Sequence, residues 1–494
     1  MPQPTRVLLP LVVVAAFAVA FLEETAVNVV DFDTWHQMAS ARDVLSGRVS
    51  LDSDPYSFTD TIRPIVHHEW GTGLIAYRLA ASFGPNSLLA LKYLVLACLV
   101  LIGFATARAT AGSWLDWALI VIPVVPLISV GFMPALRAQM FTYLFVAILI
   151  AVLQVDEAGK RWWIPVWLLA FPIWVNLHGG CAVAIVLMIA AAGERIVRNA
   201  PFAHLLFVSA AMAALLMVNP FGSAYYEFLW RTLRNARPYL LEWQPLWKSL
   251  HVFPMFLVCV LTLLIGISQT GWRKVPGIAI LLVTGFMALN AIKLAPLFGI
   301  AWLSYGPAIV SGTRLRRDIE RQNRDAPHRP LLCWLVLLVI FAVSGGARQW
   351  QVRVPGQPLS ALGVPPYPVG TVNYLADQKF RGNILAPFEF GAYVTWKLSS
   401  AAKIFLDSRY EEVYPEHLFA EEVRFYTAGP GWREILSLYP IDVVIVPNAT
   451  AAAAVMPGSG WPLVYVDPQY RLYSRPGLGL PARAADTAPD GTLP

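Results

Sequence analysis

Apolar runs of near-spanning length recur through the first 345 residues of this chain. The hydrocarbon core of a bilayer is about 30 Å thick, and roughly 20 apolar residues in a helix cross it. With 57% hydrophobic and only 14% charged residues, the chain differs from ordinary soluble globules. The runs lie at 7–22, 87–107, 114–130, 139–155, 162–175, 179–194, 202–218, 252–269, 275–290, 295–311 and 330–345. We therefore predict a polytopic α-helical membrane protein with about 11 transmembrane helices.

The basic residues gather in short loops between these runs. If the N-terminus is cytoplasmic, Arg108, Lys160, Arg195, Arg273 and the arginine-rich stretch at 314–329 all fall on the cytoplasmic side, as the positive-inside rule requires. This rule explains the formal charge of +6 without a nucleic-acid partner. An odd number of spans then places the first loop and everything after residue 345 outside the cytoplasm.

The chain changes character after residue 345. Short β-rich runs at 383–386, 403–406, 442–446, 463–466 and 471–473 alternate with helical patterns at 415–426 and 431–438. We predict a membrane domain over 1–345 with a large first extracytoplasmic loop at 23–86, and a small extracytoplasmic α/β domain over 346–475. The Ala-, Pro- and Gly-rich segment 476–494 is predicted to be disordered.

The first loop concentrates carboxylates and histidines. Asp31 and Asp33 follow the first apolar run, and His68 and Glu69 come just before the chain returns to the membrane. A carboxylate there suits a general base or a ligand of a divalent cation, although a single one at a span boundary often marks only the water interface. We predict Asp33, Asp31 and Glu69 as catalytic. Asp33 and Glu69 are the residues that would hold Mg²⁺ or Mn²⁺ if the reaction uses a metal, and no other cofactor is predicted.

A second set of polar residues falls at the outer ends of later runs. Ionisable groups at membrane depth are costly, so their collection from several runs indicates a functional site. The simpler alternative is that Asn176 caps a helix end and Lys293 extends to the membrane surface. Arg137, His178 and Lys293 suit a lipid phosphate. The residues predicted to bind substrate are His68, Arg137, Gln139, Asn176, His178, Glu242, Trp243 and Lys293.

Several short motifs carry a resemblance to a known family. They are D-F-D-T-W-H, D-P-Y-S-F-T, H-E-W, R-A-Q-M-F-T, W-V-N-L-H-G-G, N-P-F-G, E-W-Q-P, F-E-F-G-A-Y and F-L-D-S-R-Y. With the predicted topology, they resemble the GT-C superfamily of integral membrane glycosyltransferases, and more narrowly a bacterial branch of uncharacterised GT-C-like proteins. In that resemblance Asp33 matches the acidic residue that activates the acceptor, Asp31 completes the D-x-D pair, and Glu69 matches a second acidic site.

The resemblance implies a function as well as a fold. It implies transfer of a sugar from a polyprenyl-phosphate-linked donor to a glycan, lipid or protein acceptor, on the extracytoplasmic side of a bacterial inner membrane. The W-W-D-x-G signature of oligosaccharyltransferases does not occur in the sequence, which argues against an asparagine-peptide acceptor.

Two other classes of protein fit part of the pattern. A lipid or small-molecule transporter also gathers polar residues from many spans, but usually near the bilayer midplane and often in repeated halves. A non-catalytic envelope-assembly component would use the C-terminal domain for binding and would tolerate neutralisation of Asp33 and Glu69. The position of the polar groups at the outer ends of the runs favours the enzyme.

Overall fold

The structure, a computed structural model, describes residues 3–109, 114–235, 237, 240–314, 316–318, 321, 332–339, 350–359, 364–399 and 401–493. The chain forms two compact units. The first unit contains Met1–Asn28, Ala90–Val218 and Ala236–Trp350, and the second contains Val29–Leu89, Asn219–Asn235 and Gln351–Pro494. The first loop thus belongs to the same unit as the C-terminal domain, which the predicted division at residue 345 did not anticipate.

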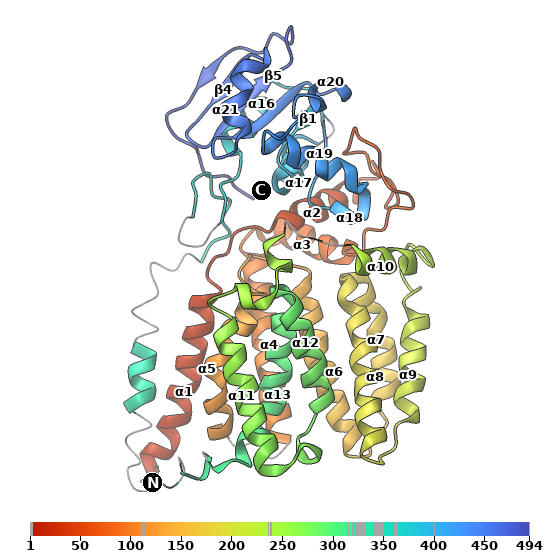
Figure 1. The fold of residues 1–494 in the computed structure, drawn as a ribbon, viewed down its shortest axis with the longest axis vertical. Helices are drawn as coiled ribbons and strands as arrows, with labels where there is room; N and C mark the ends of the chain where they lie inside the picture. The colour runs from red at the N-terminus through yellow and green to blue at the C-terminus, as the bar shows by residue number, and fades with distance from the viewer. Residues whose placement is uncertain are drawn as a thin grey trace. The chain divides into compact units, whose positions relative to one another are not determined.

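The first unit is a bundle of helices that run side by side (Figure 1). They are α1 (Gln3–Glu24), α4 (Ser87–Ala109), α5 (Trp114–Ser129), α6 (Gln139–Glu157), α7 (Trp163–Leu177), α8 (Ala182–Val197), α9 (Ala203–Leu215), α11 (Phe253–Thr270), α12 (Ile278–Asn290) and α13 (Ala295–Ser311). Each coincides with a predicted apolar run. Of the predicted run at 330–345, residues 332–339 are helical and the others lie outside the described residues, as do Arg324 and Arg329 of the basic stretch.

Among the residues that the structure describes, five helical stretches are long and apolar enough to cross a membrane. They are Ser87–Ala109, Gln139–Glu157, Gly179–Val197, Phe253–Thr270 and Ile292–Ser311. Helices α7, α9 and α12 are apolar but shorter. The helices also expose large apolar side chains, such as Leu169 at 78% and Phe207 at 66%, as expected of surfaces that face lipid. The total of eleven spans and the orientation of the loops stay predictions.

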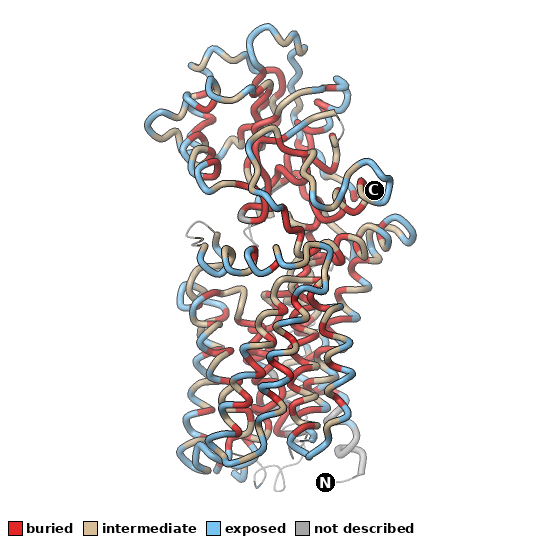
Figure 2. Tube along the Cα trace, turned by 90° about the vertical axis from the view of Figure 1, so that its right-hand side faces the viewer, coloured by how far each residue is buried: buried red, intermediate tan, exposed pale blue. Residues whose placement is uncertain are grey.

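Helix α13 forms the centre of the first unit. It is buried along most of its length and packs against α5 and α12. A Cβ atom on Gly299 would lie 2.9 Å from Cγ1 of Ile128 on α5, so a glycine allows these two helices to approach closely. The Phe298 ring packs 4.7 Å from the ring of Phe256 on α11. Buried residues accordingly line the inner faces of the helices in Figure 2.

The second unit is built around a six-stranded sheet in the order β2-β1-β3-β5-β4-β6. The strands are β1 (Gly382–Leu385), β2 (Ala402–Ile404), β3 (Val443–Pro447), β4 (Leu463–Val466), β5 (Tyr470–Ser474) and β6 (Arg483–Ala484). Strand β1 pairs in parallel with β2 and β3, and β5 runs antiparallel to β3 and β4. The predicted small C-terminal sheet is confirmed, and its centre is the buried, β-branched strand β3.

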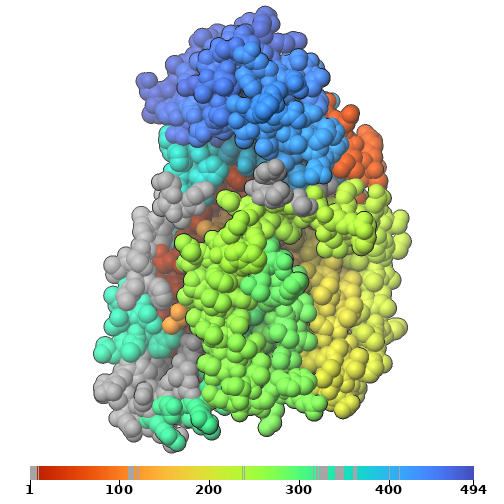
Figure 3. Space-filling view, viewed as in Figure 1, coloured from red at the N-terminus to blue at the C-terminus, as the bar shows by residue number. Residues whose placement is uncertain are grey.

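Helices from three parts of the chain complete this unit. The first loop supplies α2 (Phe32–Leu45) and α3 (Trp70–Phe83), residues 219–235 supply α10 (Ala224–Arg234), and the C-terminal part supplies the others. The others are α16 (Val369–Asp377), α17 (Phe388–Leu398), α18 (Tyr410–Val413), α19 (Glu416–Tyr426), α20 (Ile435–Leu438) and α21 (Ala452–Val455). The first loop is therefore folded structure within this unit, and Figure 3 shows orange atoms of this loop against blue atoms of the C-terminal part.

Aromatic packing fixes α2 against α17. The Trp35 side chain is fully buried, and its ring lies 5.1 Å from the ring of Tyr393. Its indole nitrogen donates a hydrogen bond to the Tyr367 hydroxyl over 3.1 Å. Because a buried indole N–H needs such a partner, this contact couples the first loop to the core of the C-terminal domain.

The segment 476–494 differs from the predicted disorder. Strand β6 pairs with β4, Gly491 bridges to Val354, and the Gly356 N–H donates to Asp490 over 2.8 Å. The composition of this segment lacks the apolar residues that usually order a chain end. Backbone pairing holds it in place instead, and composition does not report backbone pairing.

Candidate active site

Helices α2 and α3 approach each other closely where the candidate site begins. A Cβ atom on Gly73 would lie 2.4 Å from the Gln37 carbonyl oxygen, so only glycine permits this approach of the two backbones. The close approach lets the Gln37 side-chain amide donate a hydrogen bond to the Glu69 carboxylate. Glu69, at the start of α3, is 7% exposed.

His68 lies between two carboxylates. Its Nδ1 is 2.7 Å from Glu412 Oε1, and its Nε2 is 3.3 Å from Glu69 Oε1. His67 Nδ1 lies 3.8 Å from Glu412 Oε2. The His68 ring also stacks on Phe228 of α10, with the centroids 4.7 Å apart. Glu412 comes from α18, so the first loop and the C-terminal domain build this arrangement together.

His68 and Glu412 each stabilise the charged form of the other. Burial alone lowers the pKa of His68, but the negative charges of Glu412 and Glu69 outweigh it and raise that pKa well above the ordinary 6.5. Burial alone raises the pKa of Glu412, but the positive charge of His68 and the hydrogen bonds from His67 and His68 hold it well below 4.5. At neutral pH, His68 is therefore an imidazolium between two carboxylates.

This arrangement makes the stability of the second unit depend on pH. Because the pKa of His68 is raised on folding, its contribution is complete below pH 6.5 and is lost as the pH rises through the raised value. We expect the melting temperature of the wild-type second unit to fall more steeply above pH 6.5 than that of His68→Gln, as measured by thermal unfolding in detergent micelles. The exposed His417 of α19 provides the matched control, and His417→Gln should keep the wild-type slope. Equal slopes for wild type and His68→Gln would contradict the assignment.

The pKa of His36 is shifted in the opposite direction to that of His68. It is 5% exposed, and burial, only partly offset by the charge of Glu412, lowers its pKa to about 4. His36 is therefore neutral at pH 7. Asp33 Oδ1 lies 4.0 Å from His36 Nε2. Asp31 is the N-cap of α2 and accepts a hydrogen bond from the Asp33 N–H over 3.1 Å, which is a structural role.

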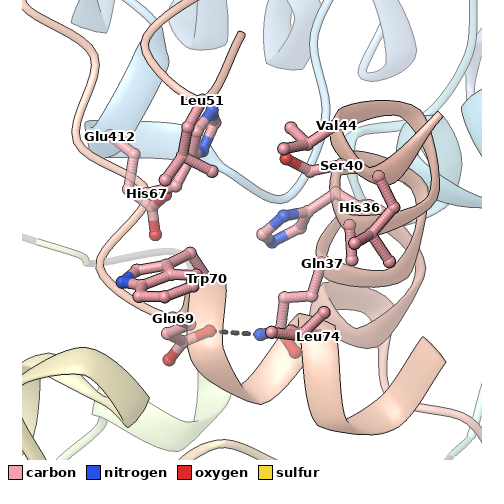
Figure 4. A pocket seen from close by; sticks show the side chains of 12 residues that line it. His36, Gln37, Ser40, Val44, Leu51, His67, Glu69, Trp70, Leu74 and Glu412 are labelled. Atoms are coloured by element: carbon pink, nitrogen blue, oxygen red, sulfur yellow. Dashed lines mark hydrogen bonds and ion pairs between the residues drawn. The ribbon is translucent and has the colours of Figure 1, made fainter. Parts of the chain in front are cut away.

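A cavity of about 130 Å³ opens between α2, the start of α3 and α18. Its polar lining consists of His36, Gln37, Ser40, His67, Glu69 and Glu412. The remaining lining is Ala41, Val44, Leu45, Leu51, Trp70 and Leu74. Figure 4 shows the His36 ring pointing into this cavity and the Glu69 carboxylate joined to Gln37 at its floor. The lining includes Glu69 but neither Asp31 nor Asp33, so Glu69 is the carboxylate of the first loop that a molecule in the cavity would meet.

A buried arginine holds α18, and with it Glu412, against the first loop. Arg409 is 2% exposed and pairs with Asp54 and Asp407, each over 2.8 Å. It also donates to the Tyr414 hydroxyl over 2.9 Å. The motifs D-P-Y-S-F-T and F-L-D-S-R-Y supply Asp54, Asp407 and Arg409. These motifs therefore have a structural explanation in this unit.

The first unit contains a separate cluster of charges. Glu242, in a short 3-10 helix (Leu241–Trp243), lies 2.6 Å from Arg137 Nη2 and 2.8 Å from Lys293 Nζ. The Lys293 ammonium also lies 4.3 Å from the centre of the Trp243 ring. Burial would raise the pKa of Glu242, but Arg137 and Lys293 hold it well below 4.5. Four of the predicted substrate-binding residues therefore meet here, with Glu242 as the counter-ion of the two cations.

The other predicted residues of the first unit have local roles. Asn176 donates to the carbonyl oxygens of Pro172 and Val218, each over 2.8 Å, which agrees with the helix-end alternative. His178 Nδ1 lies 2.7 Å from Thr142 Oγ1 and accepts the Gly180 N–H over 3.0 Å. Gln139 begins α6. Their predicted role in substrate binding stays a prediction.

Sequence reasoning missed Glu412, His36 and Gln37 as lining residues. His36 follows Asp33 by three residues, which places both on one face of a helix. Glu412 is the second residue after the F-L-D-S-R-Y motif. The predicted metal ligands gain no added support in the second unit, because Glu69 already receives the Gln37 amide and faces the positively charged His68. Metal binding by Asp33 and Glu69 stays a prediction.

Comparisons with known proteins add no family. No protein-family model matches the chain, and a search of curated proteins found no match. The functional argument therefore rests on the residues and their geometry.

Proposed function

We propose that this protein is a membrane glycosyltransferase of GT-C type, which moves a sugar from a polyprenyl-phosphate-linked donor to an acceptor hydroxyl. The observation that carries the proposal is the cavity of the second unit, which both Glu69 and neutral His36 line. A buried carboxylate fixed by a hydrogen bond beside a neutral imidazole is suited to proton transfer. The motif resemblance and the apolar helices supply the reaction class and the membrane setting.

In the proposed reaction the acceptor hydroxyl attacks the anomeric carbon of the donor. Glu69 takes the hydroxyl proton, the new glycosidic bond forms with inversion, and the bond between the sugar and the phosphate oxygen breaks. The lipid phosphate leaves with the electron pair. Gln37 and His68 hold the Glu69 carboxylate in position, and Asp33 orients His36. Such a reaction requires mainly positioning and charge stabilisation from the protein.

The Glu242 cluster is proposed to bind the phosphate of a polyprenyl-phosphate lipid. Two cations share one carboxylate, so the cluster keeps a positive charge that attracts a phosphate. A bound phosphate would contact Arg137 and Lys293 in place of the Glu242 carboxylate.

The phosphate assignment predicts opposite effects for two neighbouring substitutions. We expect Glu242→Gln to bind polyprenyl phosphate several-fold more tightly, because it removes the competing carboxylate, and Arg137→Gln to bind it at least about tenfold more weakly, because it removes a charge-assisted contact. The control is Arg273→Gln, which changes an exposed arginine in another loop. Binding to purified protein in nanodiscs measures all three. Weaker binding by Glu242→Gln would contradict the competition, and unchanged binding by Arg137→Gln would contradict the site.

A donor panel tests the function itself. The wild-type protein in proteoliposomes is supplied with radiolabelled sugars linked to polyprenyl phosphates, and label in acceptor products is counted. We expect transfer from at least one donor. The proposal includes eleven spans, a cytoplasmic N-terminus and an extracytoplasmic second unit in a bacterial inner membrane, so donor supplied on the extracytoplasmic side should be used. Transfer only from donor on the opposite side would contradict this orientation.

A further inference from the structure

Helix α10 has three stripes of different character. At 3.6 residues per turn, its buried side chains Tyr225 and Phe228 share one stripe. Glu227, Arg231 and Arg234 form a charged stripe on a second face. Tyr226, Leu229, Trp230 and Leu233 form an apolar stripe on the third face. A helix that packs on its own protein and otherwise faces water needs one buried apolar face and one polar face. The additional, exposed apolar face of α10 therefore requires an explanation.

The apolar stripe is strongly exposed. Leu233 is 77% exposed, Trp230 is 58% exposed and Tyr226 is 37% exposed. The Arg234 guanidinium lies 4.2 Å from the centre of the Trp230 ring, at the border between the apolar and charged stripes. Tryptophan and tyrosine with adjacent arginine are typical of the level of lipid headgroups, where the rings contact acyl chains and the guanidinium contacts phosphate.

The position of α10 in the chain limits what can cover this stripe. The apolar helix α9 ends at Leu215, and only residues 216–223 connect it to α10. Eight residues reach at most about 30 Å even when fully extended. The next apolar helix in the chain, α11, begins at Phe253 and is long enough to cross a membrane. Helix α10 therefore lies in the connection between two apolar helices. Lipid that surrounds such helices is always available to cover an apolar stripe.

The charge of the segment agrees with lipid phosphate as the partner. The charged stripe of α10 carries one carboxylate and two guanidinium groups, and Arg237 follows the helix. This net positive charge is complementary to an anionic membrane surface.

We infer that α10 is an interfacial helix, which inserts Trp230, Leu233 and Tyr226 among the lipids and places Arg234 at the headgroup phosphates of an anionic membrane. Its opposite face reaches the candidate active site, because Phe228 stacks on His68. Two side chains, Phe228 and His68, thus connect the helix that contacts lipid to the Glu412 and Glu69 carboxylates. The inference does not depend on glycosyl transfer.

Fluorescence depth measurement tests the inference in the full chain. Cys98, Cys181, Cys259 and Cys333 are changed to alanine, and a single cysteine is introduced by Leu233→Cys and labelled with an environment-sensitive nitrobenzoxadiazole dye. The protein is placed in vesicles of phosphatidylcholine, with or without phosphatidylglycerol. The matched control is Asn373→Cys, at an exposed polar position on α16 of the same unit.

We expect the dye at position 233 to emit at shorter wavelength than the control and to be quenched by lipids that carry a nitroxide near the headgroup. Iodide in the buffer should quench the control more strongly than position 233. Phosphatidylglycerol should increase lipid quenching at position 233, and Arg234→Glu should remove that increase. Iodide quenching at position 233 equal to the control, without lipid quenching, would overturn the inference and would indicate that water or another protein surface covers the stripe.

A second measurement needs no cysteine changes. The native protein is irradiated in vesicles that contain phosphatidylglycerol with a photoreactive group near the headgroup, and modified peptides are identified by mass spectrometry. Adducts between Tyr226 and Arg234 support the inference. Adducts on α9 and α11 but none on α10 would overturn it, whatever the behaviour of the labelled variants.

Discussion

Replacing Glu69 with glutamine is expected to lower the turnover of sugar transfer by a factor of about 10² to 10⁴, which is the usual contribution of a positioned general base. Glutamine keeps the size of the side chain and its ability to accept a hydrogen bond from Gln37, but it cannot take the proton of the acceptor. The fall should therefore appear in kcat, with a smaller effect on donor KM. Initial rates in proteoliposomes, with insertion of each variant verified, measure it.

The two aspartates of the first loop provide graded controls. Asp31→Asn should keep near-wild-type turnover, because asparagine also caps helices and the observed role of Asp31 is the cap of α2. Asp33→Asn should have an intermediate effect, because Asp33 lies 4.0 Å from His36 and outside the cavity lining. A loss of turnover in Asp33→Asn alone, with Glu69→Gln fully active, would move the base to Asp33.

Replacing Arg409 with alanine is expected to destabilise the second unit by about 3–5 kcal/mol, the usual effect of removing one partner from a buried ion pair. The substitution leaves Asp54 and Asp407 buried without the guanidinium that neutralises both. It also removes the link that holds α18 against the first loop, so Glu412 should become mobile. Pulse proteolysis in urea, with cleavage followed between residues 364 and 493, measures the change in unfolding free energy.

Arg424 of α19 provides the matched control. Its side chain is 43% exposed and pairs with the exposed Glu434 over 3.7 Å. Since exposed ion pairs contribute about 0 to 1 kcal/mol, Arg424→Ala should change stability little. If Arg409→Ala were as stable as Arg424→Ala, the buried Arg409 network would have no role in holding the two segments together.

The length of the apolar runs was sufficient to locate the helices of the first unit, because a helix that faces lipid needs an unbroken apolar run. A short continuous run of β-branched residues likewise located β3. The membership of the first loop in the second unit was not predictable in this way. It depends on contacts between residues more than 300 positions apart, such as Trp35 with Tyr367, and a single sequence contains no record of such pairs.

Some residues of the candidate site could likewise be predicted from the sequence, and others could not. The acidic and histidine-rich composition of the first loop identified Glu69 and His68, since such residues are rare in an apolar chain. Asp31 caps α2, a role that its spacing from Asp33 also allows, so its catalytic role stays a prediction. The composition missed Glu412, because that residue reaches the site through the fold of the C-terminal domain. In the first unit the sequence identified four residues one by one, namely Arg137, Glu242, Trp243 and Lys293. Only the distances show that they meet in one cluster.

The central claim is that the protein forms a glycosidic bond and does not move an intact lipid-linked sugar. The most direct measurement incubates the wild-type protein in proteoliposomes with a doubly labelled polyprenyl-phosphate sugar and follows both labels. We expect free polyprenyl phosphate and glycosylated acceptor in equal amounts, and both at least about a hundredfold more slowly with Glu69→Gln. Appearance of the intact donor on the other side of the vesicle, at equal rates for wild type and Glu69→Gln and with no free polyprenyl phosphate, would contradict it and identify a transporter.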